Sequence, residues 1–411
     1  MTKSPLIKNK ELFLDDKPSV YALRQQAKSL LEKNGFPTLK TEAWKYTNIS
    51  NLINKDFDIN NQQSECHCHN NSHDDYFINI RFCCGLLHIE EYKLPDGLII
   101  DTLPVALYED LYKKQINKSF SCEKHPFAAL NTVYIEQGIC ICVTKNTNIT
   151  QPIKITYKNT ECVSTQNNIH NLFILEKNSK LNIVEEYISQ KNNSYLSNIV
   201  NEIYLDDFSE LNHYKALKES QNSFHIALNS VKVKSNAQYN QFYCSNASKL
   251  SRNENLINLE KDNARANIYS AYKTKKDCLT DITTNIHHLA KETKSNQYAK
   301  CVLSENSSAV FQGKIHIAPN SEKSQGEQLH KALYLSNNAS LNCKPELEIY
   351  TDDVKCSHGA SCGEINPEQL FYLTSRGINK DQAIKMLTDA HLDEIFSLIK
   401  DEKIKEILIN Y

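Results

Sequence analysis

Arginine is scarce in this sequence of 411 residues. The chain has only Arg24, Arg81, Arg252, Arg265 and Arg376, although lysine and arginine together number 47. Paired guanidinium contacts to bases and phosphates need more of this residue. The formal net charge of -2 gives no general attraction to polyanions either. We therefore expect no nucleic acid among the partners of this protein.

Long hydrophobic runs are also missing. None approaches the roughly 18 to 20 residues that a membrane span needs, and residues 1–17 lack the apolar stretch of a secretory signal. We expect a cytoplasmic protein without a membrane partner. In a reducing compartment, its 14 cysteines should be free thiols or metal ligands rather than disulfides, and most should be small apolar core residues.

Motifs of the common catalytic folds are absent too. The sequence contains no Walker-type phosphate loop, no nucleophile elbow of the GxSxG kind and no dinucleotide-binding fingerprint. This absence argues against an independent catalytic activity, so we expect the protein not to be an enzyme.

The first 75 residues indicate a helical region that ends in a polar insertion. Pro18 stands where a first-turn proline would, and Gly35 stands where a helix would end. Apolar residues between them recur at helical spacing. The insertion contains Cys66, His67, Cys68 and His69 within a run of polar residues. It is either a soft-metal site or an ordinary surface insertion.

Residues 76–362 carry a degenerate repeat. An apolar residue is followed by about five mostly polar residues and then by an extended segment with alternating apolar positions. Successive copies start about 26 to 32 residues apart over most of this stretch, and Leu289–Ser295 is a weaker copy. The clearest copies are Leu175–Leu181, Leu205–Leu211, Val233–Tyr239, Leu259–Arg265, Leu303–Ala309 and Leu335–Leu341.

Such a repeat of strands and turns predicts a solenoid whose rungs bury their apolar faces against each other. Asparagine in the corners fits, because it tolerates the left-handed backbone of a tight turn. The alternative is an antiparallel sandwich, which does not require a recurrent spacing. We therefore predict a mainly β protein with a right-handed parallel β-helix core and helical N-terminal and C-terminal parts.

Residues 363–411 predict a C-terminal helical region. Asn366 and Pro367 provide an N-cap and a first-turn proline for a helix that stops at Gly377. A second helix should start at Asn379 or Asp381, and a last helix should span about Leu392–Leu408. These helices could close one end of the solenoid, form a docking surface for a partner, or do both.

The segment from Glu348 to Gly363 is the densest group of residues with possible chemistry. Cys356 and His358 alternate on a predicted strand and so share a face, and Cys362 follows. Two soft ligands on one face can bind iron or receive sulfur, but they do not complete a shell of four. The remaining ligands would come from elsewhere, including a second chain. The alternative is a structural strand end with an inward cysteine.

Several strings in this sequence resemble the motifs of a known protein family. The C-terminal strings are Asp352–Ala360 (DDVKCSHGA) and Glu368–Ile378 (EQLFYLTSRGI). The strings Thr41–Thr47 (TEAWKYT), His125–Asn131 (HPFAALN) and Lys344–Lys355 (KPELEIYTDDVK) match in kind. Together they resemble the SufB/SufD family, SufD branch, and the resemblance spans about residues 18–380. Cys362 and the insertion at 65–73 depart from the family pattern.

The resemblance implies a scaffold subunit of an iron–sulfur cluster assembly complex, with a SufC-type ATPase, a SufB-type paralogue and, indirectly, a cysteine desulfurase system as partners. It implies that iron or a cluster is held only transiently, at an interface shared with the paralogue. On this sequence the metal residues would be Cys356 and His358, with Cys362 as a weaker candidate. The expected ATPase contact comprises Gln369, Leu370, Phe371, Tyr372, Leu373 and Arg376.

Three alternatives remain open from the sequence. The chain could be the SufB-type paralogue itself, although the SHGA string argues against it. It could be a purely structural β-helix partner without a metal role. It could also be a polysaccharide-degrading β-helix, although those enzymes need clustered carboxylates, arginine or calcium ligands along a groove.

Overall fold

The computed structural model describes residues 4–8, 17–59, 74–88, 93–108, 112, 114–159, 164–189, 193–246 and 248–410. The cysteine- and histidine-rich stretch at 65–73 lies outside these residues. Within the described ranges, no helix has the length and apolar character needed to cross a bilayer.

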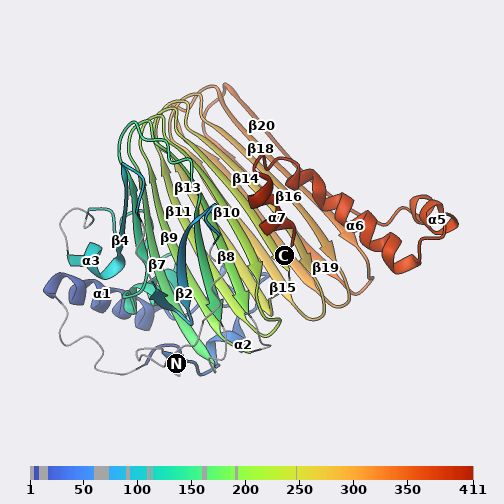
Figure 1. Cartoon of the computed structure of the whole chain (residues 1–411), viewed down its shortest axis with the longest axis horizontal. Helices are drawn as coiled ribbons and strands as arrows, with labels where there is room; N and C mark the ends of the chain where they lie inside the picture. The colour runs from blue at the N-terminus through green and yellow to red at the C-terminus, as the bar shows by residue number, and fades with distance from the viewer. Residues whose placement is uncertain are drawn as a thin grey trace.

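Two long sheets face each other and form the body of the molecule (Figure 1). In spatial order, sheet A contains β19 (Ser340–Ile349), β17 (Ser308–Ile317), β15 (Leu279–His288), β13 (Leu250–Leu259), β11 (Phe224–Val233), β9 (Leu196–Leu205), β7 (Thr165–Leu175), β5 (Ile139–Val143) and β4 (Leu98–Thr102), with β1 (Asp58–Ile59) beside β7. Sheet B contains β20 (Val354–Glu364), β18 (Ser324–Tyr334), β16 (Lys294–Leu303), β14 (Arg265–Thr274), β12 (Gln238–Asn246), β10 (Glu210–Lys218), β8 (Lys180–Ser189), β6 (Ile153–Asn159), β2 (Ile78–Cys83) and β3 (Leu86–His88).

From β5 to β20, consecutive strands alternate between the two sheets, and each strand from β7 to β18 pairs in parallel with the strands two places before and after it. Among the described strands, only the β2–β3 and β4–β5 pairs are antiparallel, and both lie at the N-terminal end of the stack. The result is a β-helix of about seven turns. This confirms the predicted parallel solenoid and excludes the antiparallel sandwich.

The corners between rungs are tight because one residue in each adopts a left-handed backbone. Asn178, Asn236 and Asn263 have φ values of 56°, 55° and 61°, and Phe208 and Glu292 take the same conformation. The backbone N–H of each residue donates to a carbonyl in the corner of the next rung, as from Asn178 to Asp207 O at 2.8 Å. Asparagine is favoured at such positions because its backbone tolerates positive φ.

The structure corrects the register of the predicted repeat. Leu289–Ser295, read as a weaker copy, is a full member of the series that begins at Leu175–Leu181, since each links sheet A to sheet B. Leu303–Ala309 and Leu335–Leu341 instead lie on the opposite side and link sheet B back to sheet A. Both kinds of corner use the same polar turn chemistry, which is why the sequence did not separate them.

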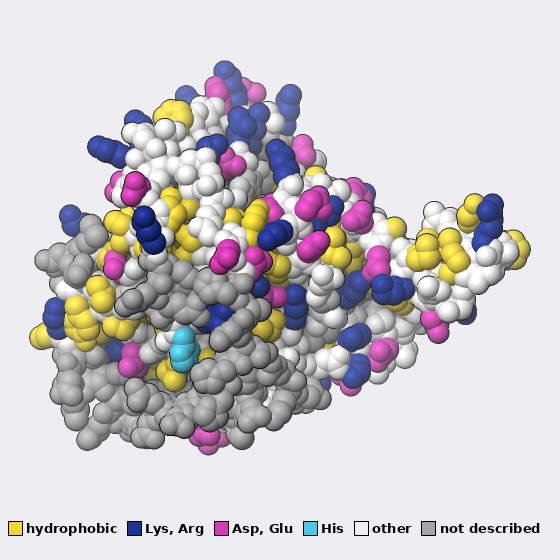
Figure 2. Space-filling view, in the orientation of Figure 1, with side chains coloured by type: hydrophobic (Ala, Val, Ile, Leu, Met, Phe, Trp, Pro, Cys, Tyr) yellow, Lys and Arg dark blue, Asp and Glu magenta, His cyan; other side chains and the backbone are white. Residues whose placement is uncertain are grey.

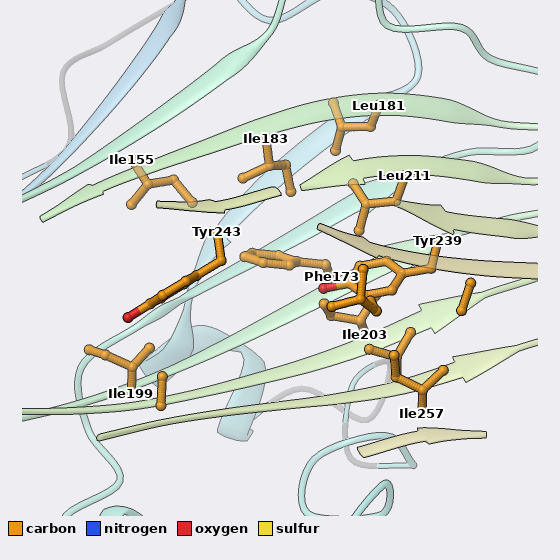
Figure 3. Packing of buried hydrophobic residues seen from close by; sticks show 14 of the residues in the cluster. Ile155, Phe173, Leu181, Ile183, Ile199, Ile203, Leu211, Tyr239, Tyr243 and Ile257 are labelled. Carbon is orange, nitrogen blue, oxygen red and sulfur yellow. The ribbon is translucent and has the colours of Figure 1, made fainter. Parts of the chain in front are cut away.

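Apolar side chains from both sheets fill most of the space between them. Ile183 and Leu211 from sheet B and Phe173, Ile203 and Ile257 from sheet A are at most 1% exposed and pack together (Figure 3). Each alternates along its strand with an outward residue, as a pleated strand requires. This burial stabilises every rung through its neighbours, because a single rung has too little apolar surface to fold alone.

The middle of this interior is polar. Along sheet A, the side-chain amides of Asn171, Asn201, Asn229 and Asn255 hydrogen-bond in series at 2.9, 3.0 and 3.0 Å. All four side chains are buried. The ladder pairs these four amides from one rung to the next, which offsets the cost of burying them.

Opposite the ladder, sheet B contributes a buried charged cluster. Glu185 lies 3.0 Å from both Lys215 Nζ and His213 Nε2, and all three side chains are 0% exposed. Asn201 and Tyr157 also donate to the Glu185 carboxylate. Burial alone would raise the pKa of Glu185, but Lys215 and His213 outweigh it and hold that pKa far below its usual range.

The N-terminal region covers the outer face of sheet A. Helix α1 begins at Pro18, as predicted, and Gly35 caps its C-terminal end. The backbone N–H of Gly35 donates to Leu31 O at 2.9 Å. Residues of this region share an apolar cluster with β9, β11 and β13. The helices are α1 (Pro18–Asn34), the 3-10 turn η1 (Glu42–Trp44), α2 (Ser50–Ile53), α3 (Leu103–Tyr108) and α4 (Pro126–Val133).

Two of the N-terminal strings fasten this layer to the sheet. Trp44 stacks on the buried Arg252 guanidinium, whose carbon lies 4.1 Å from the ring centroid. His125 Nδ1 lies 3.2 Å from Glu254 Oε1. Asn131 donates to two backbone carbonyls of neighbouring rungs at 2.9 Å each. These strings therefore have a structural role on the outer face of sheet A.

The C-terminal helices are α5 (Pro367–Ser375), α6 (Lys380–Phe396) and α7 (Glu402–Ile409). Asn366 caps α5 and Asn379 caps α6, as predicted. The predicted single helix from Leu392 to Leu408 is wrong. Helix α6 ends at Phe396, and Asp401 caps α7 by accepting from Ile404 N at 3.1 Å.

Of the two interpretations considered for these helices, closure of one end of the solenoid is wrong. Helix α6 packs on β14 and β16, and α7 packs on β10, so both lie along the outer face of sheet B. Leu392, Ile395 and Phe396 join an apolar cluster there. Helix α5 projects beyond the body of the molecule (Figure 1). The last rung is left uncovered by these helices.

Candidate functional site

Strand β20 carries the candidate metal residues, and it is the last strand of sheet B. It pairs on one side with β18, and in the described chain nothing pairs with its other side. Cys356 is half-buried, whereas His358 and Cys362 are exposed. The three predicted residues therefore lie on the terminal rung, where a second molecule can reach them.

The strand register shows which way these side chains face. Cys356, His358 and Cys362 are aligned with Gly326, Gln328 and Ala332 of β18. Those three β18 positions are buried residues of the inward-facing series. Because side-chain direction is shared by aligned residues of neighbouring strands, Cys356, His358 and Cys362 all belong to the inner face of the β-helix at its open end. The prediction that Cys356 and His358 share a face is confirmed.

Sequence reasoning missed a further cysteine at this end. Cys343 on β19 is aligned with the core residue Phe311 and packs against the interior apolar cluster. It therefore faces into the same end of the solenoid from the opposite sheet. Cys343 lies two residues after Leu341, so the two share a face of the strand, and this spacing could have indicated an inward position. Only the pairing of the rungs places Cys343 opposite β20.

The two partly buried thiols at this end, those of Cys343 and Cys356, are protonated at neutral pH. Burial raises the pKa of Cys343 to about 11 and raises the pKa of Cys356, which a backbone hydrogen bond from Gly326 partly offsets. A thiol must lose its proton to bind a metal or attack sulfur. A positive charge brought by a metal ion or a partner would therefore be needed to activate Cys356.

The described residues contain no group of three or more histidine, cysteine, aspartate or glutamate side chains placed to hold a metal ion. What this end offers is a set of separate donors, with the soft sulfurs of Cys343, Cys356 and Cys362 and the imidazole of His358. Sulfur and imidazole donors suit iron and iron–sulfur clusters. A complete shell at this end needs donors from another molecule.

Both sheets end here in long strands with a free edge. β19 and β20 stand last in their sheets, and their residues are mostly half-buried or exposed. Unpaired N–H and C=O groups on such edges pair readily with strands of another chain. At the other end of the stack, the short antiparallel strands β3 and β4 close the sheets instead. The open end is therefore the face suited to a protein partner.

Helix α5 forms a second exposed feature. None of its residues is buried, and Phe371 and Tyr372 are 72% and 57% exposed. The Arg376 guanidinium lies over the Tyr372 ring, 4.9 Å from its centroid. Figure 2 shows hydrophobic side chains gathered on this projecting tip. Of the predicted contact residues, Gln369 and Arg376 are exposed and Leu370 and Leu373 are half-buried. Helix α5 and its C-cap residue Arg376 therefore present all six.

Comparison with known protein families identifies both parts of the chain. Residues 156–391 match the family described as SUF system FeS cluster assembly, SufBD core domain. Residues 7–155 match the SufBD protein N-terminal region. The chain belongs to the SufBD family of iron–sulfur cluster assembly proteins.

Individual relatives agree with membership of the SufBD family. The iron–sulfur cluster assembly protein SufD of Escherichia coli is 27% identical over 400 residues, which cover 93% of this chain and 90% of the relative. A SufBD family protein of Synechocystis is 27% identical over 401 residues, covering 92% and 86%. The chloroplastic protein ABCI7 of Arabidopsis thaliana is 25% identical over 408 residues, covering 95% and 84%. The resemblance seen in the sequence strings is thus confirmed at the level of the family.

Proposed function

We propose that this SufBD family member is a SufD-type scaffold subunit, without catalytic activity of its own, in a cytoplasmic complex that assembles iron–sulfur clusters. The observation that supports this role best is the open end of the β-helix. There, unpaired strand edges and the thiol and imidazole of Cys356 and His358 occupy one rung.

In this proposal a SufB-type paralogue joins the chain at the edges of β19 and β20. The paralogue supplies the ligands that one chain lacks, so iron or a nascent cluster is bound transiently between the two. His358 provides a neutral imidazole nitrogen, and Cys356 provides sulfur once the positive charge of iron favours its thiolate. Cys362 lies on the same inner face and is a weaker candidate. Sulfur arrives indirectly from a cysteine desulfurase system.

Helix α5 is the proposed contact for a SufC-type ATPase. An exposed aromatic pair beside an arginine is typical of the residues that dominate protein–protein binding energy. ATP binding would bring two ATPase subunits together and move the α5 helices of this chain and its paralogue. The coupling requires that the nucleotide-bound and nucleotide-free states contact α5 differently.

Co-purification tests the assembly. The tagged chain is expressed with its genomic neighbours, and the captured proteins are identified. The proposal predicts that a paralogue and an ATPase are recovered with it. Ala360→Pro in β20 should release the paralogue but keep the ATPase, because the register with β18 leaves the N–H of this residue on the free edge, where proline removes the donor and leaves α5 unchanged. Recovery of the chain alone, or of the same partners with the proline variant, would contradict the proposed interface.

A further inference from the structure

A row of polar side chains crosses the last three rungs of sheet A on its outer face. His287 on β15 is aligned with His316 on β17, which is aligned with Glu348 on β19. The neighbouring residues Ile286 and Ile315 point into the core, which places this row on the opposite, outward side. The row lies on the other sheet from Cys356 and His358, and nothing in the function proposed above uses it.

The two imidazoles are spaced as ligands of one ion would be. Their ring centroids are 5.2 Å apart, and the ring planes are inclined at 40°. A metal–nitrogen bond of about 2.1 Å places a ring centre roughly 3.2 Å from the metal. Two imidazoles at a tetrahedral angle around one ion therefore have centroids roughly 5 Å apart. The observed spacing matches this value without movement of either strand.

Glu348 orients the nearer imidazole. Its Oε2 lies 3.1 Å from His316 Nδ1, and its Oε1 accepts from Lys314 Nζ at 2.6 Å. A carboxylate can only accept, so His316 Nδ1 carries the proton and Nε2 keeps its lone pair. Carboxylates hold metal-binding histidines in this way at many protein sites. Both oxygens of Glu348 are already engaged, so it supports a ligand and is not one itself.

His287 has a free donor nitrogen as well. No described residue forms a hydrogen bond with its ring, and the side chain is only partly buried. Within the described residues, the ring therefore has no hydrogen bond to give up when it binds an ion.

We propose that His287 and His316 form a binding site for a divalent first-row transition-metal ion, with water completing the shell. Imidazole nitrogen suits zinc, iron, nickel and copper. Two protein ligands make the site weaker than a structural metal centre. Lys314 and the nearby Lys124 carry positive charge, which lowers the affinity further and favours rapid exchange of the ion.

Calorimetric titration of the purified full chain with Zn²⁺ tests the site. The background variant has serine in place of the cysteines and histidines of 65–73 and carries Cys356→Ser, His358→Ala and Cys362→Ser, so that competing ligands are removed. We expect one saturable site on this background. His287→Ala or His316→Ala should each weaken it at least tenfold, whereas His88→Ala, an exposed histidine at the other end of the solenoid, should leave it unchanged.

Glu348 provides a readout that separates orientation from ligation. Glu348→Ala should weaken Zn²⁺ binding about tenfold, the lower end of the effect of such supporting carboxylates. Glu348→Gln keeps an acceptor for His316 Nδ1 and should recover much of that loss. Circular dichroism and the urea midpoint verify that each variant is folded.

A background variant that binds no Zn²⁺, or binds it equally well after both histidine substitutions, would overturn the proposal. Because the background lacks His358, neither result bears on the scaffold role. Conversely, failure of cluster formation to depend on His358 would leave this site standing.

Discussion

The buried cluster of Glu185, His213 and Lys215 gives a sharp test of the interior. The perturbation is Lys215→Met, which keeps the length of the side chain but removes its charge. Lys215 Nζ lies 3.0 Å from Glu185 Oε2 and 3.0 Å from Asn229 Oδ1, and both ionic side chains are 0% exposed. Removing one member of such a pair leaves a buried charge without its counter-ion and costs about 3–5 kcal/mol.

The expected loss lies near 3 kcal/mol, the lower end of that range, because three other donors still serve the Glu185 carboxylate. His213 lies 3.0 Å away, and Asn201 and Tyr157 lie at 3.2 and 3.1 Å. Glu185→Gln should cost a similar amount by isolating Lys215. The double variant should be more stable than either single variant, because no uncompensated charge remains.

Lys218→Met is the matched control, since it makes the same substitution on the same strand but on the outward face. Lys218 pairs with Glu186 at 2.7 Å and is partly exposed, so its loss should cost under about 1 kcal/mol. The assay is urea unfolding followed by far-UV circular dichroism and by tyrosine fluorescence, with coincidence of the two curves as the test of two-state behaviour. Equal stability of Lys215→Met and Lys218→Met would refute the reasoning.

The same cluster predicts how stability depends on pH. The folded-state pKa of Glu185 is held below its unfolded value, which is about 4.3. Its contribution to stability is therefore complete above that value and is lost as the pH falls toward the folded pKa. The unsubstituted chain should lose stability between pH 5 and pH 3 more steeply than the double variant. Parallel curves would show that Glu185 does not titrate as described.

Three further predictions concern other parts of the chain. Gly138 has a φ of 154°, and a Cβ at this position would lie 1.7 Å from His170 O. Gly138→Ala should therefore lower the free energy of unfolding, measured by urea titration, by several kcal/mol, roughly the cost of a strained backbone. Phe371→Asp on α5 should leave the melting temperature unchanged but weaken ATPase binding in a pull-down by about 30-fold or more, whereas Met386→Asp on the exposed side of α6 should not. Burial would raise the pKa of Glu254, but Arg252 and His125 outweigh it and lower that pKa to about 2. Limited proteolysis of the N-terminal layer should therefore accelerate as the pH falls from about 4 toward 2. Glu254→Gln should show the same fast cleavage already at pH 7.

The sequence was sufficient for the architecture because corner chemistry and strand alternation are local properties. Asn178, Asn236 and Asn263 stand where the backbone must turn left-handed, and this requirement is visible without the fold. The helix caps at Asn366 and Asn379 could also be predicted from the sequence. The sequence did not show which corners lie on the same side of the solenoid, because the corners on both sides use similar turns and only strand pairing separates them.

Other features depend on contacts between distant segments. The apolar stripe from Leu392 onward continues through the break between α6 and α7, so only the cap at Asp401 marks the second start. An apolar stripe shows that one face of a helix is buried, but it does not show which surface covers that face. The packing of α6 and α7 along sheet B was missed for this reason. The strand register is also needed to place Cys343 opposite β20 and to bring His287 beside His316. Alternation did predict correctly that Cys356 and His358 share a face.

The rate of cluster formation on the assembled complex tests the central claim most directly. Ser357 and His358 are consecutive on β20 and point to opposite faces, so Ser357→Ala is a matched control. With paralogue, ATPase, Fe²⁺ and a sulfur source supplied, absorbance of the new cluster should rise at least tenfold more slowly for His358→Ala than for Ser357→Ala. Equal rates for the two variants, with the complex intact, would contradict a shared site at the open end of the solenoid.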